Sequence, residues 1–144
     1  ADVAAFFTKW LDDVEEAQRE FGAYPDYCLY PMAYGKPGKT FGTAWTDAGI
    51  ICPWTIWQVY GDTRVLQHHW DSMTRFMDWR TRTSNDDLGV VHGNEWGDWL
   101  ALNEKTPLDY IDTVYFAYSA RLMAEMAWVS LSALPPMAIC TSCN

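Results

Sequence analysis

Apolar side chains recur at helical spacing along four segments of this chain. In the first segment, residues 2–21, they follow an i, i+3, i+4, i+7 pattern, while charged side chains take the opposite face. This pattern predicts an amphipathic helix that Gly22 ends. The apolar positions are Val3, Phe6, Phe7, Trp10, Leu11 and Val14.

The second and third segments read as a helical hairpin. Thr46 or Asp47 is expected to cap a helix that runs to Tyr60 and carries Pro53 in its second turn, where the ring kinks the helix rather than ending it. A third helix is expected over residues 63–82. Its predicted apolar stripe is Leu66, Trp70, Met73 and Met77, with Phe76 at the edge and Trp79 off the stripe.

Thr106 and Pro107 form a typical start for a fourth helix, predicted over residues 108–131. Its predicted apolar face is Tyr110, Ile111, Val114, Tyr115, Tyr118, Leu122, Met126 and Val129. Residues 22–43 and 83–105 are predicted to form long loops. No stretch of useful length shows the alternation of apolar and polar residues that predicts a strand. The fold class is therefore all-α, with about four main helices and two long loops in a single domain.

Charge narrows the range of partners. The formal net charge of the 144 residues is −9, so phosphate backbones and anionic membrane surfaces are repelled. No run of 18 apolar residues is present that would predict a membrane-spanning helix. We therefore expect neither nucleic acid nor membrane as a partner. A neutral glycan or small-molecule substrate meets no such penalty.

The segment 94–102, NEWGDWLAL, has the composition of a sugar site. Two tryptophans, Trp96 and Trp99, lie beside two carboxylates, Glu95 and Asp98. An aromatic ring packs on the C–H face of a pyranose, and carboxylates accept hydrogen bonds from hydroxyls or move protons. The alternative is that these rings fill the core, as most tryptophans do.

A second cluster repeats the same theme about fifty residues earlier, with Trp45 followed by Asp47. Both clusters lie in a loop or at a junction of loop and helix, so we expect them to converge at the same end of the helices. His92 precedes the first cluster and is the histidine best placed to act as an acid or base. The candidate catalytic residues are Asp47, Glu95, Asp98 and His92, and the candidate substrate-binding residues are Trp45, Trp96 and Trp99.

No metal site or cofactor is predicted. His68 and His69 are adjacent, so on a helix their side chains diverge by about 100° and do not easily ligate one ion together with Asp71. Cys140 and Cys143 have the spacing of metal or redox sites but lack a second pair. A frayed chain end is the favoured interpretation of that pair.

With these segments in place, the chain resembles the catalytic (α/α)6 barrel of the bacterial α-L-rhamnosidases, glycoside hydrolase family 78. The resemblance covers roughly residues 2–128 and implies a partial barrel of helical hairpins and an inverting glycosidase mechanism. It also implies that Trp45, Asp47, Asp98 and Trp99 surround the sugar-binding subsite. The matching stretches are residues 2–18, 42–66, 96–100 and 106–127.

Two departures from that family shape the expected function. The resemblance places the general acid upstream of residue 2 and the general base downstream of the fourth helix, so neither falls on this chain. It also stops near Trp128, after which the sequence carries no charged side chain. We therefore expect residues 1–128 to be a partial glycosidase-like domain, and residues 129–144 to be an irregular tail produced by a frameshift or by genuine divergence.

Three hypotheses follow for function. The first is a rhamnosidase fragment that keeps part of the sugar-binding wall and has little activity. The second is a weak hydrolase whose new site forms in an oligomer. The third is a non-catalytic helical module that self-associates. In each case a part of a barrel leaves apolar flanks open, so a homodimer or larger homo-oligomer is expected.

Overall fold

Four α-helices make up the regular structure of the chain. The computed structural model describes residues 2–28, 42–84 and 96–132, and within these ranges it contains helices and turns but no extended strand. The helices are α1 (Ala4–Glu16), α2 (Ala48–Tyr60), α3 (Arg64–Thr83) and α4 (Leu108–Ser132). The predicted all-α class with four main helices is thus confirmed.

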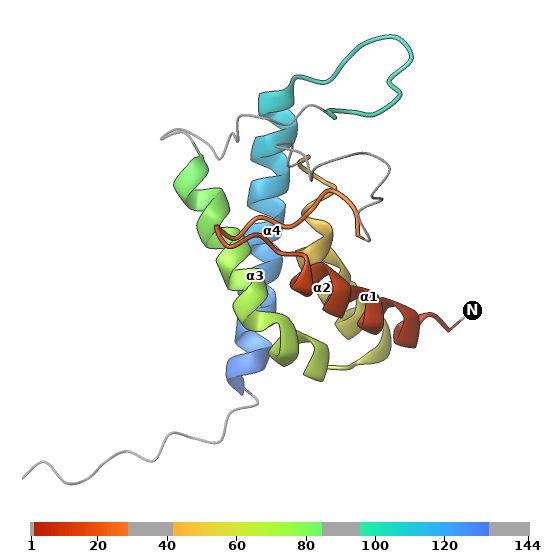
Figure 1. Ribbon diagram of the computed structural model, residues 1–144, viewed down its shortest axis with the longest axis vertical. Helices are drawn as coiled ribbons and strands as arrows, with labels where there is room; N and C mark the ends of the chain where they lie inside the picture. The colour runs from red at the N-terminus through yellow and green to blue at the C-terminus, as the bar shows by residue number, and fades with distance from the viewer. Residues whose placement is uncertain (1, 29–41, 85–95, 133–144) are drawn as a thin grey trace, which may run out of the picture.

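Helix α2 is the centre of the arrangement and packs against α1, α3 and α4. Its sequence, AGIICPWTIWQVY, is apolar on nearly every side, as expected for a helix surrounded by others. Pro53 lies inside the helix and is buried. The α3 and α4 helices run beside each other, and α1 packs on α2 and α3 (Figure 1). Trp54 Nε1 donates to Glu125 Oε2 at 2.9 Å, which joins α2 to α4.

The α1 helix is shorter than predicted, since it ends at Glu16 rather than near residue 21. Gln18 Nε2 donates instead to the carbonyl oxygens of Gly22 and Ser72, at 2.8 and 2.9 Å. Gly22 then adopts a φ of +109°, and a Cβ there would lie 2.4 Å from the Arg75 carbonyl oxygen. The chain leaves the helix early because this turn bonds to α3.

The apolar stripe of α3 was only partly predicted. Leu66 and Met73 are buried, as expected, but Phe76 and Trp79 are buried too, whereas they were predicted at the edge and off the stripe. Phe76 stacks on Tyr24 with ring centroids 4.9 Å apart. The stripe is therefore rotated toward the segment that follows α1.

The predicted apolar face of α4 is only partly right in its first half, where Ile111, Tyr115 and Tyr118 are half-buried. Tyr110 and Val114 are exposed, and the buried positions there are Asp112 and Ser119. On α1, similarly, Phe6 belongs to the predicted apolar stripe but is 65% exposed. Polar side chains replace apolar ones inside one end of the bundle, which places a polar interior next to the candidate site.

The apolar core lies between all four helices. Its buried members are Leu11, Val14, Ala23, Tyr24, Ile50, Ile56, Val65, Leu66, Met73, Phe76, Trp79, Leu122 and Met126. Gly61 closes α2 with a φ of +67°, and its N–H donates to the Trp57 carbonyl at 2.8 Å before α3 begins. Over the described ranges, no helix combines the length and apolar character needed to cross a membrane.

Candidate functional site

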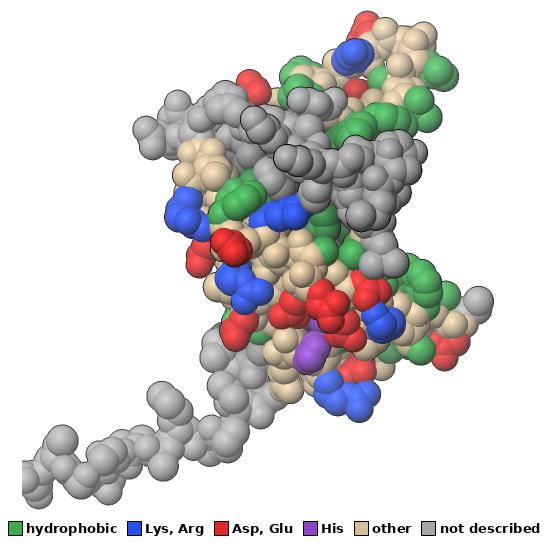
Figure 2. Space-filling model, viewed as in Figure 1, with side chains coloured by type: hydrophobic (Ala, Val, Ile, Leu, Met, Phe, Trp, Pro, Cys, Tyr) green, Lys and Arg blue, Asp and Glu red, His purple; other side chains and the backbone are tan. Residues whose placement is uncertain are grey.

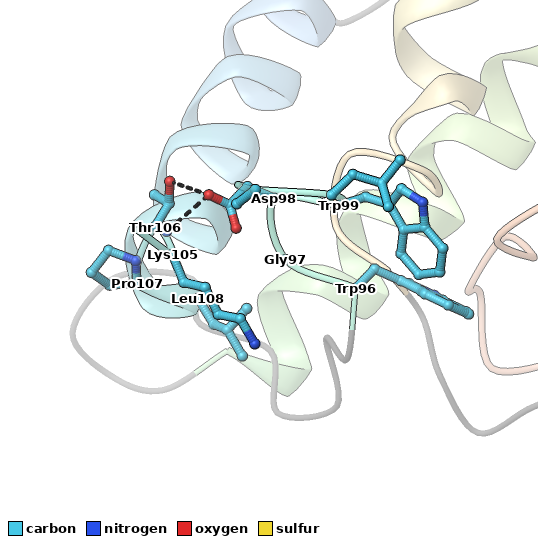
Figure 3. A pocket seen from close by; sticks show the side chains of 10 residues that line it. Trp96, Gly97, Asp98, Trp99, Lys105, Thr106, Pro107 and Leu108 are labelled. Carbon is cyan, nitrogen blue, oxygen red and sulfur yellow. Dashed lines mark hydrogen bonds between the residues drawn. The ribbon is translucent and has the colours of Figure 1, made fainter. Parts of the chain in front are cut away.

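Three tryptophan rings meet at the end of the bundle where α2 and α4 begin. Trp45 comes from the turn before α2. Trp96 and Trp99 come from the segment before α4 (Figure 3). The Trp45 centroid lies 6.3 Å from that of Trp96 and 6.4 Å from that of Trp99, and the last two are 5.0 Å apart. Trp99 is 56% exposed, so this aromatic cluster presents a ring face to solvent.

Asp26 and Gly42 position Trp96. One Asp26 carboxylate oxygen accepts from Trp96 Nε1 at 2.9 Å, and the other accepts from the Gly42 N–H. A Cβ on residue 42 would lie 2.1 Å from Trp96 Cδ1, so the ring packs where only glycine leaves room. The loop after α1 therefore helps to hold the cluster together.

The turn over residues 42–47 positions Trp45. Ala44 adopts a left-handed φ of +75°, and its N–H donates to Asp47 Oδ2 at 3.0 Å. Such a conformation costs about 1 kcal/mol or more for a residue other than glycine, and the surrounding bonds must maintain it. Asp47 stands at the N-cap position of α2 as predicted, yet its side chain makes no capping bond to that helix. Its other oxygen accepts from Ser119 Oγ at 2.6 Å.

Below this turn lies a buried polar cluster, defined here as Thr43, Asp47, Arg80, Asp112 and Ser119. Arg80 has no exposed surface and lies over the Phe116 ring, at 5.6 Å from its centroid. Its Nη1 donates to Thr43 Oγ1 at 3.0 Å, and its Nη2 donates to the Asp112 carbonyl at 3.1 Å. Thr43 Oγ1 also bonds to the Asp112 carboxylate. The cluster thus ties the Trp45 turn to α3 and α4.

Burial sets the electrostatics of Asp47. It raises the pKa of this carboxyl group, because a charged carboxylate is poorly solvated inside the protein. The Arg80 guanidinium and the bonds from Ser119 and Ala44 oppose that shift in pKa without cancelling it. Asp47 therefore holds its proton more tightly than an exposed aspartate does.

Asp98 has the opposite character. Its Oδ2 accepts from the Thr106 N–H at 2.9 Å and from Thr106 Oγ1 at 2.8 Å, and these bonds lower the pKa of the carboxyl group. Figure 3 shows the Asp98 side chain directed at Thr106, while the rings of Trp96 and Trp99 extend the other way. In this arrangement Asp98 fastens the start of α4 rather than facing the rings.

Two open hollows adjoin the aromatic cluster. One of about 430 Å³ is lined by the segment that runs from Trp96 to Leu108, and the other, of about 440 Å³, is lined partly by Trp10 and Trp45. Both volumes are in the range of sites that hold small molecules. A monosaccharide is small enough for either hollow.

The structure brings together the three predicted substrate-binding tryptophans, and it describes two of the predicted catalytic residues, Asp47 and Asp98, both bonded to other parts of the protein. Asp47 has no exposed surface, so direct contact with a substrate would require its neighbours to move. Asp98 is bonded to Thr106, and Glu95 and His92 lie outside the described residues. Catalysis by any of these four stays a prediction.

Sequence reasoning missed the buried polar cluster, although signals for it were present. Arg80 follows Met73 and Phe76 at i+7 and i+4, which places a charge in line with the apolar stripe of α3. Ser119 precedes Leu122 and Met126 by three and seven positions, which is also helical spacing. A charged residue that continues an apolar stripe can mark a buried ion rather than the edge of the stripe.

Comparison with known proteins places this chain in a family. The model of the bacterial α-L-rhamnosidase six-hairpin glycosidase domain matches residues 1–132. The chain belongs to this α-L-rhamnosidase family. An α-L-rhamnosidase of Streptomyces avermitilis is 41% identical over 125 residues, which cover 86% of this chain, and one of Formosa agariphila is 32% identical over 136 residues, which cover 90%.

Solved structures of α-L-rhamnosidases share the fold. The enzyme from Dictyoglumus thermophilum superposes with a TM-score of 0.73 at 25% identity over 92% of this chain. The enzyme from Aspergillus terreus superposes with a TM-score of 0.74 at 23% identity over 91%. This chain spans only 12% and 14% of the two curated relatives and 15% and 16% of the two solved chains. Its four helices thus match one part of a six-hairpin barrel.

Proposed function

We propose that this chain forms part of the catalytic six-hairpin domain of an α-L-rhamnosidase and supplies an L-rhamnose-binding wall. The observation that carries the proposal is the aromatic cluster, in which the centroid of the Trp45 ring lies 6.3 and 6.4 Å from those of two rings about fifty residues further along the chain. Membership in the family, whose relatives are α-L-rhamnosidases, identifies L-rhamnose as the proposed sugar.

The chemistry of the cluster suits a deoxy sugar. One face of an L-rhamnose ring, together with its methyl group, is apolar and packs on an indole ring, and the hydroxyls point toward polar groups. Trp99 offers the exposed ring face, and the 430 Å³ hollow beside it offers space. Lys105, which lines that hollow, supplies a donor for sugar hydroxyls.

Hydrolysis by this chain alone is proposed to be slow. An inverting glycosidase needs an acid and a base with carboxyl groups about 6.5–9.5 Å apart. The family resemblance assigns neither role to a residue of this chain, and Asp98 is already bonded to Thr106. Each missing acid–base group typically costs a factor of about 10²–10⁴ in rate.

Sugar binding is testable by saturation-transfer NMR, which observes the protons of L-rhamnose rather than the protein. Wild-type protein is expected to transfer saturation to the sugar, and Trp99→Ala is expected to abolish the transfer. Trp128→Ala is the matched control, since Trp128 is 77% exposed on α4 and outside the cluster. Equal transfer in wild type and Trp99→Ala, or none in wild type, would overturn the proposal.

Turnover of an aryl α-L-rhamnoside separates a binding wall from a hydrolase. We expect rates far below those of an intact enzyme and unaffected by Asp98→Ala. A readily measured rate that Asp98→Ala removes would instead support a stand-alone hydrolase with a new site.

Exposed apolar side chains favour a second role, in which the chain associates with further copies of itself. Phe6 and Tyr110 are 65% and 63% exposed on α1 and α4, and Val114 and Trp128 extend the exposed face of α4. Large apolar patches are rare on soluble monomers. Light scattering at low micromolar concentration should give at least twice the 16.5 kDa chain mass, and Tyr110→Glu should lower it. A clean monomer would contradict this role.

A further inference from the structure

Two histidines and an aspartate meet on the face formed by α1 and α3, away from the aromatic cluster. His68 Nε2 lies 3.2 Å from Asp12 Oδ1, and His69 Nε2 lies 3.7 Å from the same oxygen. One ligand atom of each residue lies within 4.8 Å of the other two. They border a hollow of about 590 Å³. Figure 2 shows the histidine on this face lying against a group of acidic side chains.

His69 has a buried ring nitrogen without a hydrogen-bond partner among the described residues, which is typical of an incomplete ligand site. Its ring is 3% exposed, and its Nδ1 lies 2.7 Å from Glu15 Oε2. Because a carboxylate only accepts, Nδ1 carries the proton, and in the neutral ring Nε2 then has a bare lone pair. That Nε2 is buried and has no hydrogen-bond partner among the described residues. A buried lone pair that faces the Asp12 carboxylate is unfavourable unless a proton or a metal cation lies between them.

We propose that Asp12, His68 and His69 form a zinc-type metal site that links α1 to α3. In a tetrahedral site with bonds of about 2.0–2.1 Å, neighbouring ligand atoms lie roughly 3.3 Å apart. The separations of 3.2 and 3.7 Å from Asp12 Oδ1 are close to that value. His68 is 68% exposed, so its ring is free to turn toward the same ion.

The ligand set selects the class of metal. Imidazole nitrogens with one carboxylate suit Zn²⁺ and its neighbours in the transition series, whereas Mg²⁺ and Ca²⁺ prefer oxygen ligands throughout. Glu15 adds the carboxylate that commonly orients a metal-bound histidine from behind. Asp62, which lines the same hollow, is paired with Arg64 at 2.8 Å, so a water is left to fill the fourth position.

Asp71, the third ligand weighed from the sequence, lies on the same helix as the histidines. Adjacent residues diverge along one helix, but the structure supplies the third ligand from a different helix, α1. Asp12 lies beside both rings, so the divergence of about 100° no longer prevents a common ion.

One alternative accounts for the same contacts without a metal. A doubly protonated His69 would form ion pairs with Glu15 and Asp12, and its Nε2–H would point at an oxygen 3.7 Å away, beyond a good hydrogen bond. The two readings differ in one respect. An ion-paired histidine has no reason to bind one Zn²⁺ per chain, whereas the proposed site does.

Zinc titration of the full chain tests the proposal, with a chromophoric chelator as competitor at pH 7.5. Cys140 and Cys143 are a separate source of zinc ligands, so the titration uses Cys140→Ser/Cys143→Ser as the background. We expect one Zn²⁺ per chain in that background. Co²⁺ in its place should give weak visible bands without a sulfur charge-transfer band.

Two variants remove ligands that are at least partly exposed, so the fold should survive. His68→Gln and Asp12→Asn are each expected to weaken Zn²⁺ binding at least tenfold, with circular dichroism unchanged. Glu15→Gln, which leaves the three ligands in place, should weaken it by about 10–100-fold. Asp78→Asn, an exposed carboxylate elsewhere on α3, is the matched control and should change affinity by less than twofold.

Three results would overturn the metal site. The first is no stoichiometric Zn²⁺ binding in the Cys140→Ser/Cys143→Ser background, which would place any bound ion on that cysteine pair. The second is unchanged affinity in both His68→Gln and Asp12→Asn. The third is an equal loss in the Asp78→Asn control, which would indicate nonspecific attraction to an acidic surface.

Discussion

The interior of this chain has an apolar part and a polar part, and both draw side chains from α3 and α4. On α3 the change from apolar to polar occurs in one turn, from Phe76 to Arg80, and on α4 it occurs between Leu122 and Ser119. All four side chains are fully buried. The apolar part joins all four helices, whereas the buried polar cluster lies under the turn that carries Trp45.

The apolar part mainly stabilises the fold, whereas the polar part mainly fixes the position of the turn that carries Trp45. Burying apolar surface stabilises the fold by roughly 25 cal/mol per Å². Burying a charge costs desolvation free energy, and the hydrogen bonds of that charge at best offset this cost. The polar cluster is therefore a poor source of stability for its size. Its bonds have fixed directions, however, so they hold the Trp45 turn in one place relative to α3 and α4.

The largest expected effect on stability comes from removing the positive charge of Arg80. Arg80→Met keeps a similar length but removes the donor to Thr43 Oγ1 and the Asp112 carbonyl, and it removes the charge that favours the ionised form of Asp47. Removing the group that compensates a buried charge typically costs about 3–5 kcal/mol, because the charge left behind is uncompensated. Urea denaturation should show this loss.

Arg64→Met serves as the control for that change, because Arg64 is an exposed arginine whose partner, Asp62, is also at the surface. It should leave the urea midpoint unchanged. If Arg80→Met and wild type had similar urea midpoints, the Arg80 charge would contribute little to stability. That result would contradict the distinction drawn here between the polar and apolar parts of the interior.

A smaller loss is expected from the apolar part. Leu122→Ala removes a fully buried side chain and should destabilise the fold by about 2–5 kcal/mol, depending on how far the cavity collapses. Leu102→Ala, at a side chain that is 95% exposed, is the matched control. The sugar-binding signal should survive Leu122→Ala under native conditions, since the Trp45 turn keeps its bonds.

Gly42→Ala should disturb the site more than the fold. Its new Cβ would lie 2.1 Å from Trp96 Cδ1, so the ring must move, at a cost of about 1–3 kcal/mol. We expect a changed tryptophan emission spectrum and loss of sugar binding, whereas Gly61→Ala, at a position with open space around it, should alter only stability. An unchanged emission spectrum in Gly42→Ala would contradict the packing described here.

The smallest effect is on the dependence of stability on pH. The pKa of Asp47 is raised in the folded state, so its contribution is fully present below the ordinary value of 3.8 and is lost as pH rises through the folded value. Asp47→Asn should remove this fall. The pKa of Asp98 is lowered, so its contribution is lost as pH falls below 3.8, and Asp98→Asn should flatten that acid limb instead. Matching profiles in both variants would contradict the assignments.

The spacing of apolar residues predicted the apolar part of the interior but not the buried polar cluster, and the reason is physical. Leu66, Met73 and Leu122 could be placed because an apolar side chain at helical spacing has a strong reason to be buried. Asp112 and Ser119 could not, since their burial depends on partners from other helices that a single segment does not reveal. Tertiary hydrogen bonds decided those positions.

The same limit applies to the site. Composition alone was enough to select Trp45, Trp96 and Trp99, because clustered aromatic rings beside carboxylates are uncommon. The partners that position them, Asp26 and Gly42, stand in a loop without any periodic signal. The end of α1 at Glu16 was not predicted for the same reason. The Gln18 side chain donates a hydrogen bond to the Ser72 carbonyl of α3, and the sequence of α1 alone does not reveal that partner.

The short connection between α2 and α3 bears on the order in which the chain folds. Only Gly61, Asp62 and Thr63 separate the two helices, so their contacts are local and close quickly. The bonds of the polar cluster join residues 37 and 72 positions apart and must wait for long loops to close. We expect kinetic φ-values near 0.5 or above in the α2–α3 hairpin and near zero at Ser119. The turn bearing Trp45 would then be among the last parts of the molecule to take its native form.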